Sequence, residues 1–186
     1  MLNEEKLIDG CSKGKRKYQK MLYEQYSSKM FVVSLRYTKS RLDAEDTLQD
    51  AFVKVFSNIQ NFRRECPLEH WIKKIVINTA LKHKRSKLYD YPTKDVEEME
   101  NLLPDREFTL SNYHFNELLK FVQQLPDRCQ VIFNLYAIEG YQHKEIAEML
   151  KINEGTSKSQ YSRAKMLLQK MILQNEEVRY EQFRKG

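Results

Sequence analysis

The sequence predicts an all-α protein made of two small helical domains that a flexible acidic linker joins. Only 5 Gly and 4 Pro interrupt the 186 residues, which is few for the many turns of a β-sheet protein. Apolar residues recur at spacings of three and four over several long stretches, as on the buried face of a helix. One acidic stretch lacks this spacing, and it divides the chain into two parts.

The first domain is expected to span residues 1–88 and to contain three long helices. The first helix covers 15–38, where apolar residues share one face. The second is expected to begin at Asp43, whose carboxylate can accept bonds from the N–H groups of the first turn. A loop, "NFRRECPL", precedes the third helix. Because Trp71 lies in phase with the apolar residues of that helix, we expect it to be a core anchor.

The second domain is expected over residues 112–174, where the helical spacing returns. Its later part predicts a short helix over 143–150 and a tight connection, "KINEG". A last helix follows, from about residue 156 to beyond 171. This order of helix, short turn and helix is typical of a helix-turn-helix.

The segments outside the two domains are polar. Residues 89–111 are expected to form the linker, because they carry two prolines and too little apolar surface to fold alone. Residues 175–186 are expected to form a polar tail. The net charge is +6, and the positive charge is concentrated in 63–87 and 158–170. This net positive charge indicates an anionic partner such as nucleic acid, a phosphate-bearing membrane or an acidic protein.

Composition argues against several other classes. The 3 Cys and 4 His are scattered, without the paired spacing of a zinc site, so we expect no metal and no other cofactor. No apolar run approaches the roughly eighteen residues of a membrane span, and the N-terminus lacks the apolar stretch of a signal peptide. We therefore expect a cytoplasmic protein that does not insert into membranes.

The last helix has a face rich in hydrogen-bond donors. Its predicted core positions are Tyr161, Ala164 and Leu168, and the opposite face holds side chains that can contact phosphates and base edges. No acidic residue occurs from 157 to 174, which favours a major-groove reader over a plain helical hairpin with a solvated basic face. The residues expected to contact DNA are Lys158, Ser159, Gln160, Ser162, Arg163 and Lys165.

The first basic block mixes cations with aromatic side chains and Asn78, a combination that suits single-stranded nucleic acid. The helix before it carries the opposite charge, on an exposed face that is expected to run from Glu45 to Val53. Such a face would repel DNA. It fits a protein partner with a basic surface, but a charged helix face can also be merely solvated, and both interpretations stay open here.

The order and spelling of three stretches closely resemble the extracytoplasmic-function (ECF) sigma factors of the sigma-70 family. They are "LDAEDTLQDAF", "NFRRECPLEHWIKKIVINTALKH" and "EGYQHKEIAEMLKINEGTSKSQYSRAK". The resemblance runs from about Tyr18 to Ile172. It implies a promoter-recognition subunit that binds core RNA polymerase and promoter DNA and has no active site of its own. It also implies an anti-sigma factor as a further candidate partner, and no small-molecule substrate.

The resemblance assigns a role to each part of the chain. The acidic helix is expected to dock on the largest polymerase subunit. The loop and the helix after it resemble the part that captures a flipped base of the minus-ten element, and the last helix resembles the reader of the minus-thirty-five element. The other residues expected to take part are Asp46, Gln49, Asp50 and Lys54 at the polymerase, and Phe62, Arg63, Asn78, Lys82 and Arg85 at the minus-ten element.

The chain departs from the family pattern at several positions. Arg64 stands where the family usually has Gly. Ser157 occupies a position that is usually aliphatic and in the core, and Gln160 replaces a common Arg. We therefore expect the last helix to read an unusual sequence.

Two other classes of protein fit parts of the sequence. A helix-turn-helix repressor would bind its operator without polymerase, but it needs a dimerisation or effector module, and no run of coiled-coil heptads is evident. A nuclease needs paired metal-binding carboxylates or a nucleophile beside a base, and Asp46 with Asp50 does not suffice without histidine or a phosphate cradle. Operator binding without polymerase, or metal-dependent DNA cleavage, would favour these classes.

Overall fold

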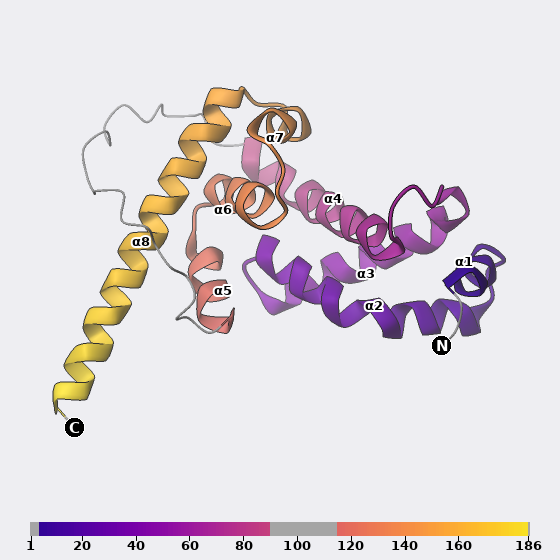
Figure 1. Ribbon diagram of the computed structural model, residues 1–186, viewed down its shortest axis with the longest axis horizontal. Helices are drawn as coiled ribbons and strands as arrows, with labels where there is room; N and C mark the ends of the chain where they lie inside the picture. The colour runs from indigo at the N-terminus through magenta and orange to yellow at the C-terminus, as the bar shows by residue number, and fades with distance from the viewer. Residues whose placement is uncertain (1–3, 90–114, 186) are drawn as a thin grey trace. The chain divides into compact units, whose positions relative to one another are not determined.

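The computed structural model describes residues 4–89 and 115–185 (Figure 1). Within these two ranges every regular element is helical and no strand occurs, which confirms the predicted all-α class. The chain divides into two compact units, Met1–Ser86 and Lys87–Gly186. The predicted linker, 89–111, lies outside the described residues except for its first position.

The N-terminal unit packs its helices around one core. It contains α1 (Glu4–Ser12), α2 (Arg16–Tyr37), α3 (Arg41–Asn58), the short 3-10 helix η1 (Ile59–Asn61) and α4 (Leu68–Tyr89). Helices α2 and α3 pack against each other, as Figure 1 shows. Ala44 and Ala51 of α3 are fully buried, and so is Leu22 of α2. The small alanines let the helix backbones approach closely.

Helix α1 was not predicted from the sequence. Its residues Leu7, Ile8 and Cys11 are buried, and the helix packs on α2 and η1. Gly10 allows this packing, because a Cβ atom there would overlap the ring of Tyr18. So short a helix offers too few apolar positions to establish a helical period in the sequence.

The start of α3 corrects a predicted helix cap. The helix begins at Arg41, and its N-cap is Ser40 rather than Asp43. The Ser40 hydroxyl accepts from the backbone N–H of Asp43 at 3.0 Å and donates to the Asp43 carboxylate at 2.7 Å. Asp43 therefore lies in the first turn, where its negative charge still interacts favourably with the helix dipole.

The C-terminal unit contains the predicted helix-turn-helix. Its elements are α5 (Phe115–Gln124), α6 (Asp127–Phe133), the π-helical segment η3 (Asn134–Ile138), α7 (His143–Leu150) and α8 (Glu154–Lys185). Helices α7 and α8 confirm the predicted order, with α8 beginning at Glu154 instead of about Thr156. The residues predicted as a polar tail, 175–186, are helical up to Lys185, because α8 continues through them.

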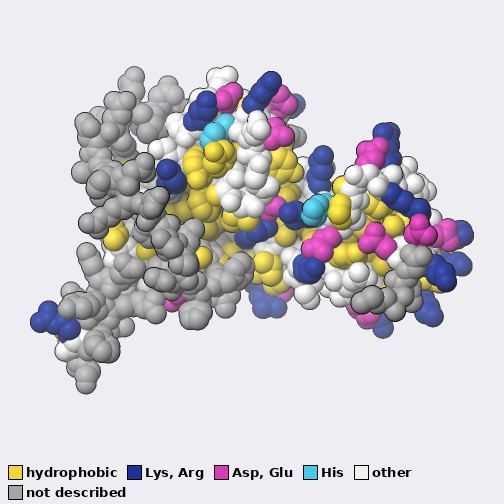
Figure 2. All heavy atoms as spheres, in the orientation of Figure 1, with side chains coloured by type: hydrophobic (Ala, Val, Ile, Leu, Met, Phe, Trp, Pro, Cys, Tyr) yellow, Lys and Arg dark blue, Asp and Glu magenta, His cyan; other side chains and the backbone are white. Residues whose placement is uncertain are grey.

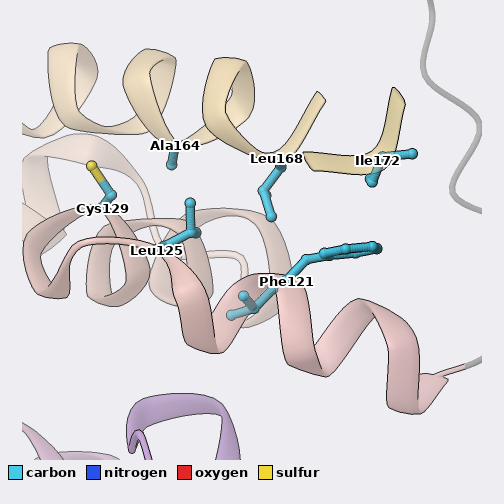
Figure 3. Packing of buried hydrophobic residues seen from close by; sticks show 7 residues of the cluster. Phe121, Leu125, Cys129, Ala164, Leu168 and Ile172 are labelled. Atoms are coloured by element: carbon cyan, nitrogen blue, oxygen red, sulfur yellow. The ribbon is translucent and has the colours of Figure 1, made fainter. Parts of the chain in front are cut away.

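The core of this unit forms where α8 packs on α5 and α6. Figure 3 shows Ala164 and Leu168 of α8 directed toward Leu125 and Phe121. Ala164, Leu168 and Ile172 are all buried, and their spacing of four places them on one stripe of the helix. This stripe determines which face of α8 is turned away from the core.

Candidate nucleic-acid interface

Local hydrogen bonds define both ends of α7 in the helix-turn-helix. The backbone N–H of Gln142 donates to the Glu145 carboxylate at 2.7 Å, which closes the first turn. At the other end, Lys151 adopts a left-handed backbone with φ of 55°, and the N–H of Ile152 donates to the Ala147 carbonyl at 3.0 Å. These bonds end α7 and redirect the chain into α8.

The face of α8 opposite its core stripe carries donor groups. The Lys158 ammonium lies 2.7 Å from the Glu154 carboxylate in an exposed pair. The Lys165 ammonium lies 5.8 Å from the centre of the Tyr161 ring. Both cations therefore stay on the helix surface, where phosphates and base edges can reach them. The exposed or half-buried members of this donor face are Lys158, Ser159, Ser162, Arg163 and Lys165.

Gln160 is the exception among the predicted DNA contacts. Its side chain is only 7% exposed, and its carbonyl oxygen accepts from the Cys129 thiol at 3.2 Å. Because Gln160 precedes Ala164 by four residues, it belongs to the stripe that faces the core. The structure therefore does not place Gln160 on the donor face, where a DNA contact was predicted, and its spacing from Ala164 is the signal that could have shown this.

A cluster of rings and a hydroxyl lies behind the first turn of α8, and the sequence pattern did not predict it. Ser157 is fully buried, and its Oγ lies 2.9 Å from Nδ1 of His143. The His143 ring stacks on Tyr136 with ring centres 4.2 Å apart, and Tyr136 lies 4.5 Å from the Tyr161 ring. Burial lowers the pKa of His143 below its ordinary value. The cluster connects α7, η3 and α8.

The N-terminal unit forms an open depression of about 480 Å³ between α3 and α4, lined by polar and apolar side chains. Asn78 and Lys82, two of the predicted minus-ten residues, line it together. Asn58 and Asn61 also line it, although the sequence pattern did not single them out. Amide and ammonium groups from separate elements therefore converge on one concave surface, which we call the α3–α4 depression.

Trp71 lies at this depression and not in the core as predicted. It is half-buried, and its ring centre lies 5.2 Å from that of Phe62. The buried stripe of α4 consists of Leu68, Ile72 and Val76, each 0% exposed. Ile77 and Leu81 are also buried, and they move the centre of the buried face of α4 away from Trp71, which falls beside it.

The loop before α4 presents arginines on its surface. Arg63 is exposed, as its predicted DNA contact requires. Arg64 has a left-handed backbone with φ of 60°, a conformation that glycine adopts without steric cost. Its guanidinium lies 3.7 Å from the Glu5 carboxylate of α1. Arg85 belongs to the helical backbone of α4, and its side chain is outside the described part of the chain.

The exposed face of α3 is acidic in its centre and apolar at its ends. Asp46, Gln49 and Asp50 are exposed. Leu42 and Val53 are 69% and 64% exposed, respectively. Their spacings of three and four place all five on one face of the helix, which we call the acidic stripe.

Side-chain contacts between described residues join α3 to α4. The Thr47 hydroxyl lies 3.2 Å from Nδ1 of His83. The Lys54 ammonium donates to the Thr79 hydroxyl at 2.9 Å, and Nε2 of His83 lies 2.9 Å from the Asp50 carboxylate. Lys54 also lines the α3–α4 depression. The structure therefore does not bring Lys54 together with the acidic stripe, where a polymerase contact was predicted, because its ammonium is directed toward α4.

Charged side chains of both signs cover much of the surface. Figure 2 shows Lys and Arg gathered around the end of the N-terminal unit where α1 lies, with Asp and Glu among them. Among the residues that the structure describes, no group of three or more His, Cys, Asp or Glu could hold a metal ion. No helix in the two described ranges is long and apolar enough to cross a membrane.

Two family models match the chain, one in each unit. The model for sigma-70 region 2 matches residues 22–88, which include the acidic stripe and the α3–α4 depression. The model for sigma-70 region 4 matches residues 115–168, which include the helix-turn-helix and the donor face of α8. Together the two models cover the larger part of the chain, in the order in which the sequence resemblance placed them.

Similar proteins extend the match over nearly the whole chain. The chain is 26% identical over 183 residues to the ECF RNA polymerase sigma-E factor of Haemophilus influenzae, covering 92% of this chain and 96% of that protein. It is also 26% identical over 180 residues to the RNA polymerase sigma-H factor of Pseudomonas aeruginosa, covering 91% and 93%. Both matches therefore cover more than nine-tenths of this chain and of the relative.

A solved structure shares the fold. It is the sigma factor RpoE in complex with the anti-sigma factor NepR from Bartonella quintana, which is 20% identical, with a TM-score of 0.50 over 82% of this chain and 95% of that one. Two region models in one chain and relatives along nearly its full length agree on one assignment. The chain belongs to the sigma-70 family, within its ECF group of RNA polymerase sigma factors.

Proposed function

We propose that this sigma factor binds core RNA polymerase and reads the minus-ten and minus-thirty-five elements of its promoters with two separate surfaces. The observation that carries the proposal is that each unit holds one donor-rich surface within the matching family region. These surfaces are the α3–α4 depression and the donor face of α8. The chain supplies specificity to initiation, and the polymerase supplies the active site for RNA synthesis.

We infer that α8 reads the minus-thirty-five element in the major groove, which is wide enough to admit a helix. Arg163 is the leading candidate for a base contact, because a guanidinium can donate two bonds to O6 and N7 of guanine. Lys158 and Lys165 suit phosphates, since an ammonium neutralises a phosphate without requiring a particular base. Their exposure on one face of α8 supports this division of roles.

The α3–α4 depression suits an unpaired base of the minus-ten element. Asn61 and Asn78 offer amide groups that can read a base edge, and Lys82 can neutralise a backbone phosphate. The Trp71 and Phe62 rings, 5.2 Å apart, offer aromatic surface for stacking. A base inside a duplex could not present both its edge and its face to these groups, so the depression favours single-stranded DNA.

The acidic stripe is the proposed polymerase contact. Asp46 and Asp50 provide negative charge at its centre, and Leu42 and Val53 leave apolar side chains exposed at its ends. This composition fits a partner surface that combines basic and apolar groups. Because the similar sigma factor of known structure is bound to an anti-sigma factor, we also propose that a partner of that kind restrains this chain.

The first test is co-elution of the purified chain with core RNA polymerase that is free of other sigma factors, on a sizing column at moderate salt. We expect a stoichiometric complex, and the holoenzyme should then select promoters from a randomised DNA library. A folded chain that forms no complex would contradict the proposal. Stable operator binding by the chain alone would instead support a repressor, and metal-dependent DNA cleavage would support a nuclease.

A further inference from the structure

We propose that His143 and Ser157 form a positioning pair that sets the orientation of α8 for reading the minus-thirty-five element. The inference rests on the function proposed for α8. His143 is the first residue of α7, and Ser157 lies in the first turn of α8. Nδ1 of the ring and Oγ of the hydroxyl are 2.9 Å apart. One side-chain hydrogen bond therefore joins the beginnings of the two helices of the helix-turn-helix.

The hydroxyl of Ser157 imposes a directional requirement that an aliphatic side chain would not. Ser157 is 0% exposed, so bulk water cannot replace His143 as the hydrogen-bond partner of its hydroxyl. A buried hydroxyl without a partner is unfavourable, and a hydrogen bond weakens steeply when its distance or angle departs from the optimum. The pair therefore favours one arrangement of α7 and α8, whereas an apolar contact would tolerate several.

The His143 ring is itself held from two sides. Tyr136 of η3 stacks on it with ring centres 4.2 Å apart and planes inclined by 10°. Tyr161 of α8 lies 4.5 Å from the Tyr136 ring and 5.8 Å from the His143 ring. Because the ring is confined in this way, Nδ1 approaches Ser157 from a defined direction.

The positioning pair lies directly behind the donor face. Ser157 immediately precedes Lys158, and Ser162 and Arg163 follow within two turns of the same helix. A change in the tilt of the first turn therefore displaces all of these donors relative to a groove. Binding to the minus-thirty-five element should depend on the pair even though the Ser157 hydroxyl is buried and is not part of the exposed donor face.

The experiment uses the full chain assembled with core polymerase. Its two DNA probes are the promoter that the wild-type holoenzyme selects from a randomised library, and the same promoter with a scrambled minus-thirty-five element. His143→Phe keeps a ring for stacking but removes the hydrogen bond, and Ser157→Val replaces the hydroxyl with an aliphatic group. The quantity measured is the ratio of the affinities for the two promoters.

We expect each single variant to reduce this ratio by about tenfold. The double variant should lose no more than either single variant, because both substitutions remove the same bond. His143→Asn should recover part of the loss, since its side-chain amide can donate or accept a hydrogen bond in place of Nδ1. A role confined to core packing predicts no such recovery, because Asn fills the space of the ring less well than Phe.

Controls separate orientation from folding. Ser12→Ala removes an exposed hydroxyl of α1 that donates to the Asp9 carbonyl at 2.9 Å, and it should leave the ratio unchanged. Thermal unfolding of every variant identifies those that do not fold. If His143→Phe does not fold, the proposal is decided by His143→Asn, which should keep part of the ratio, and by Ser157→Val, which should lose it.

The proposal is overturned if a folded Ser157→Val or His143→Phe variant keeps the wild-type ratio. It is also overturned if the two effects add fully in the double variant. If the wild-type holoenzyme binds both promoters equally, that result contradicts the function proposed for α8 itself. The two failures are therefore distinguishable, because the second is visible before any variant is made.

Discussion

The α3–α4 depression and the donor face of α8 have similar chemistry but opposite shapes. The depression is concave and is lined by amides from separate elements, among them Asn58 and Asn78, with the Trp71 ring beside them. The donor face is the convex side of one helix and carries Lys158 and Arg163. A concave site can surround one unpaired base, whereas a convex helix fits a duplex groove. Basic composition alone therefore does not distinguish a single-stranded from a double-stranded partner, and shape does.

The two surfaces are also supported by similar means. Beside the depression, the Lys54 ammonium donates across the helix pair to Thr79 at 2.9 Å. Behind the donor face, His143 meets Ser157 at 2.9 Å. In each unit a side-chain hydrogen bond joins two helices and limits their relative movement. The comparison predicts that substitutions in one unit affect one promoter element and leave the other readable.

Charge reversal at Asp50 should have the largest effect, because it would separate both surfaces from the polymerase at once. In Asp50→Lys a positive side chain would face the basic partner surface, and such repulsion costs several kcal/mol, on the order of 3 or more. Co-elution with core polymerase should be lost, while the isolated chain stays folded by circular dichroism. Asp9→Lys, at a carboxylate of α1 that is 57% exposed, is the matched control. Unchanged co-elution of Asp50→Lys would remove Asp50 from the interface.

Arg163→Ala should weaken only the reading of the duplex element. If the guanidinium contacts a base, we expect a loss of about 1–3 kcal/mol at the minus-thirty-five element. Binding of the holoenzyme to a single-stranded minus-ten oligonucleotide should not change. Lys170→Ala, which removes an exposed cation farther along α8, is the control. Wild-type affinity of Arg163→Ala for the cognate promoter would refute the assignment.

Asn78→Ala should show the converse pattern with a smaller effect. Loss of one hydrogen bond to a base edge is expected to cost about 0.5–1.5 kcal/mol. The measurement is the affinity of the holoenzyme for a single-stranded minus-ten oligonucleotide, and the minus-thirty-five ratio should stay constant. Gln25→Ala, which removes an exposed amide of α2, controls for the loss of a surface amide. An effect of Asn78→Ala on both elements would mean that the two surfaces are not independent.

The sequence predicts the elements of this fold better than the orientation of individual side chains. Long helices are predictable because stripes such as the one through Ala164 repeat over several turns. Gln160 has the chemistry of a DNA contact, but its place on that stripe buries it. The position of Trp71 depends on where the centre of the buried face of α4 lies, and Ile77 and Leu81 move that centre away from it. His143 and Ser157 meet across a turn whose geometry no spacing rule describes, so their contact required the structure.

A change of pH should have the smallest effect, and it should act on the stability of the C-terminal unit through His143. The His143 ring lies against Tyr136 and Tyr161, and the charged groups Lys158 and Glu154 are nearby. Burial lowers the pKa of His143 below its ordinary value near 6.5, the positive charge of Lys158 lowers it further, and Glu154 opposes them. The hydrogen bond from Lys158 lowers the pKa of Glu154, so that carboxylate stays ionised while His143 titrates.

Acidification below about pH 6.5 should therefore destabilise the C-terminal unit. In the unfolded chain this histidine has the higher pKa, so the unfolded chain takes up the proton first as the pH falls. The free energy of unfolding is therefore unchanged above about pH 6.5 and decreases as the pH falls from there through the lower pKa of the folded chain. Thermal unfolding from about pH 7.5 to about pH 5 should show a steeper loss for the wild type than for His143→Phe. His70→Phe, at an exposed histidine of the N-terminal unit, should keep the wild-type dependence. Equal slopes for wild type and His143→Phe would show that protonation of this ring is not linked to folding.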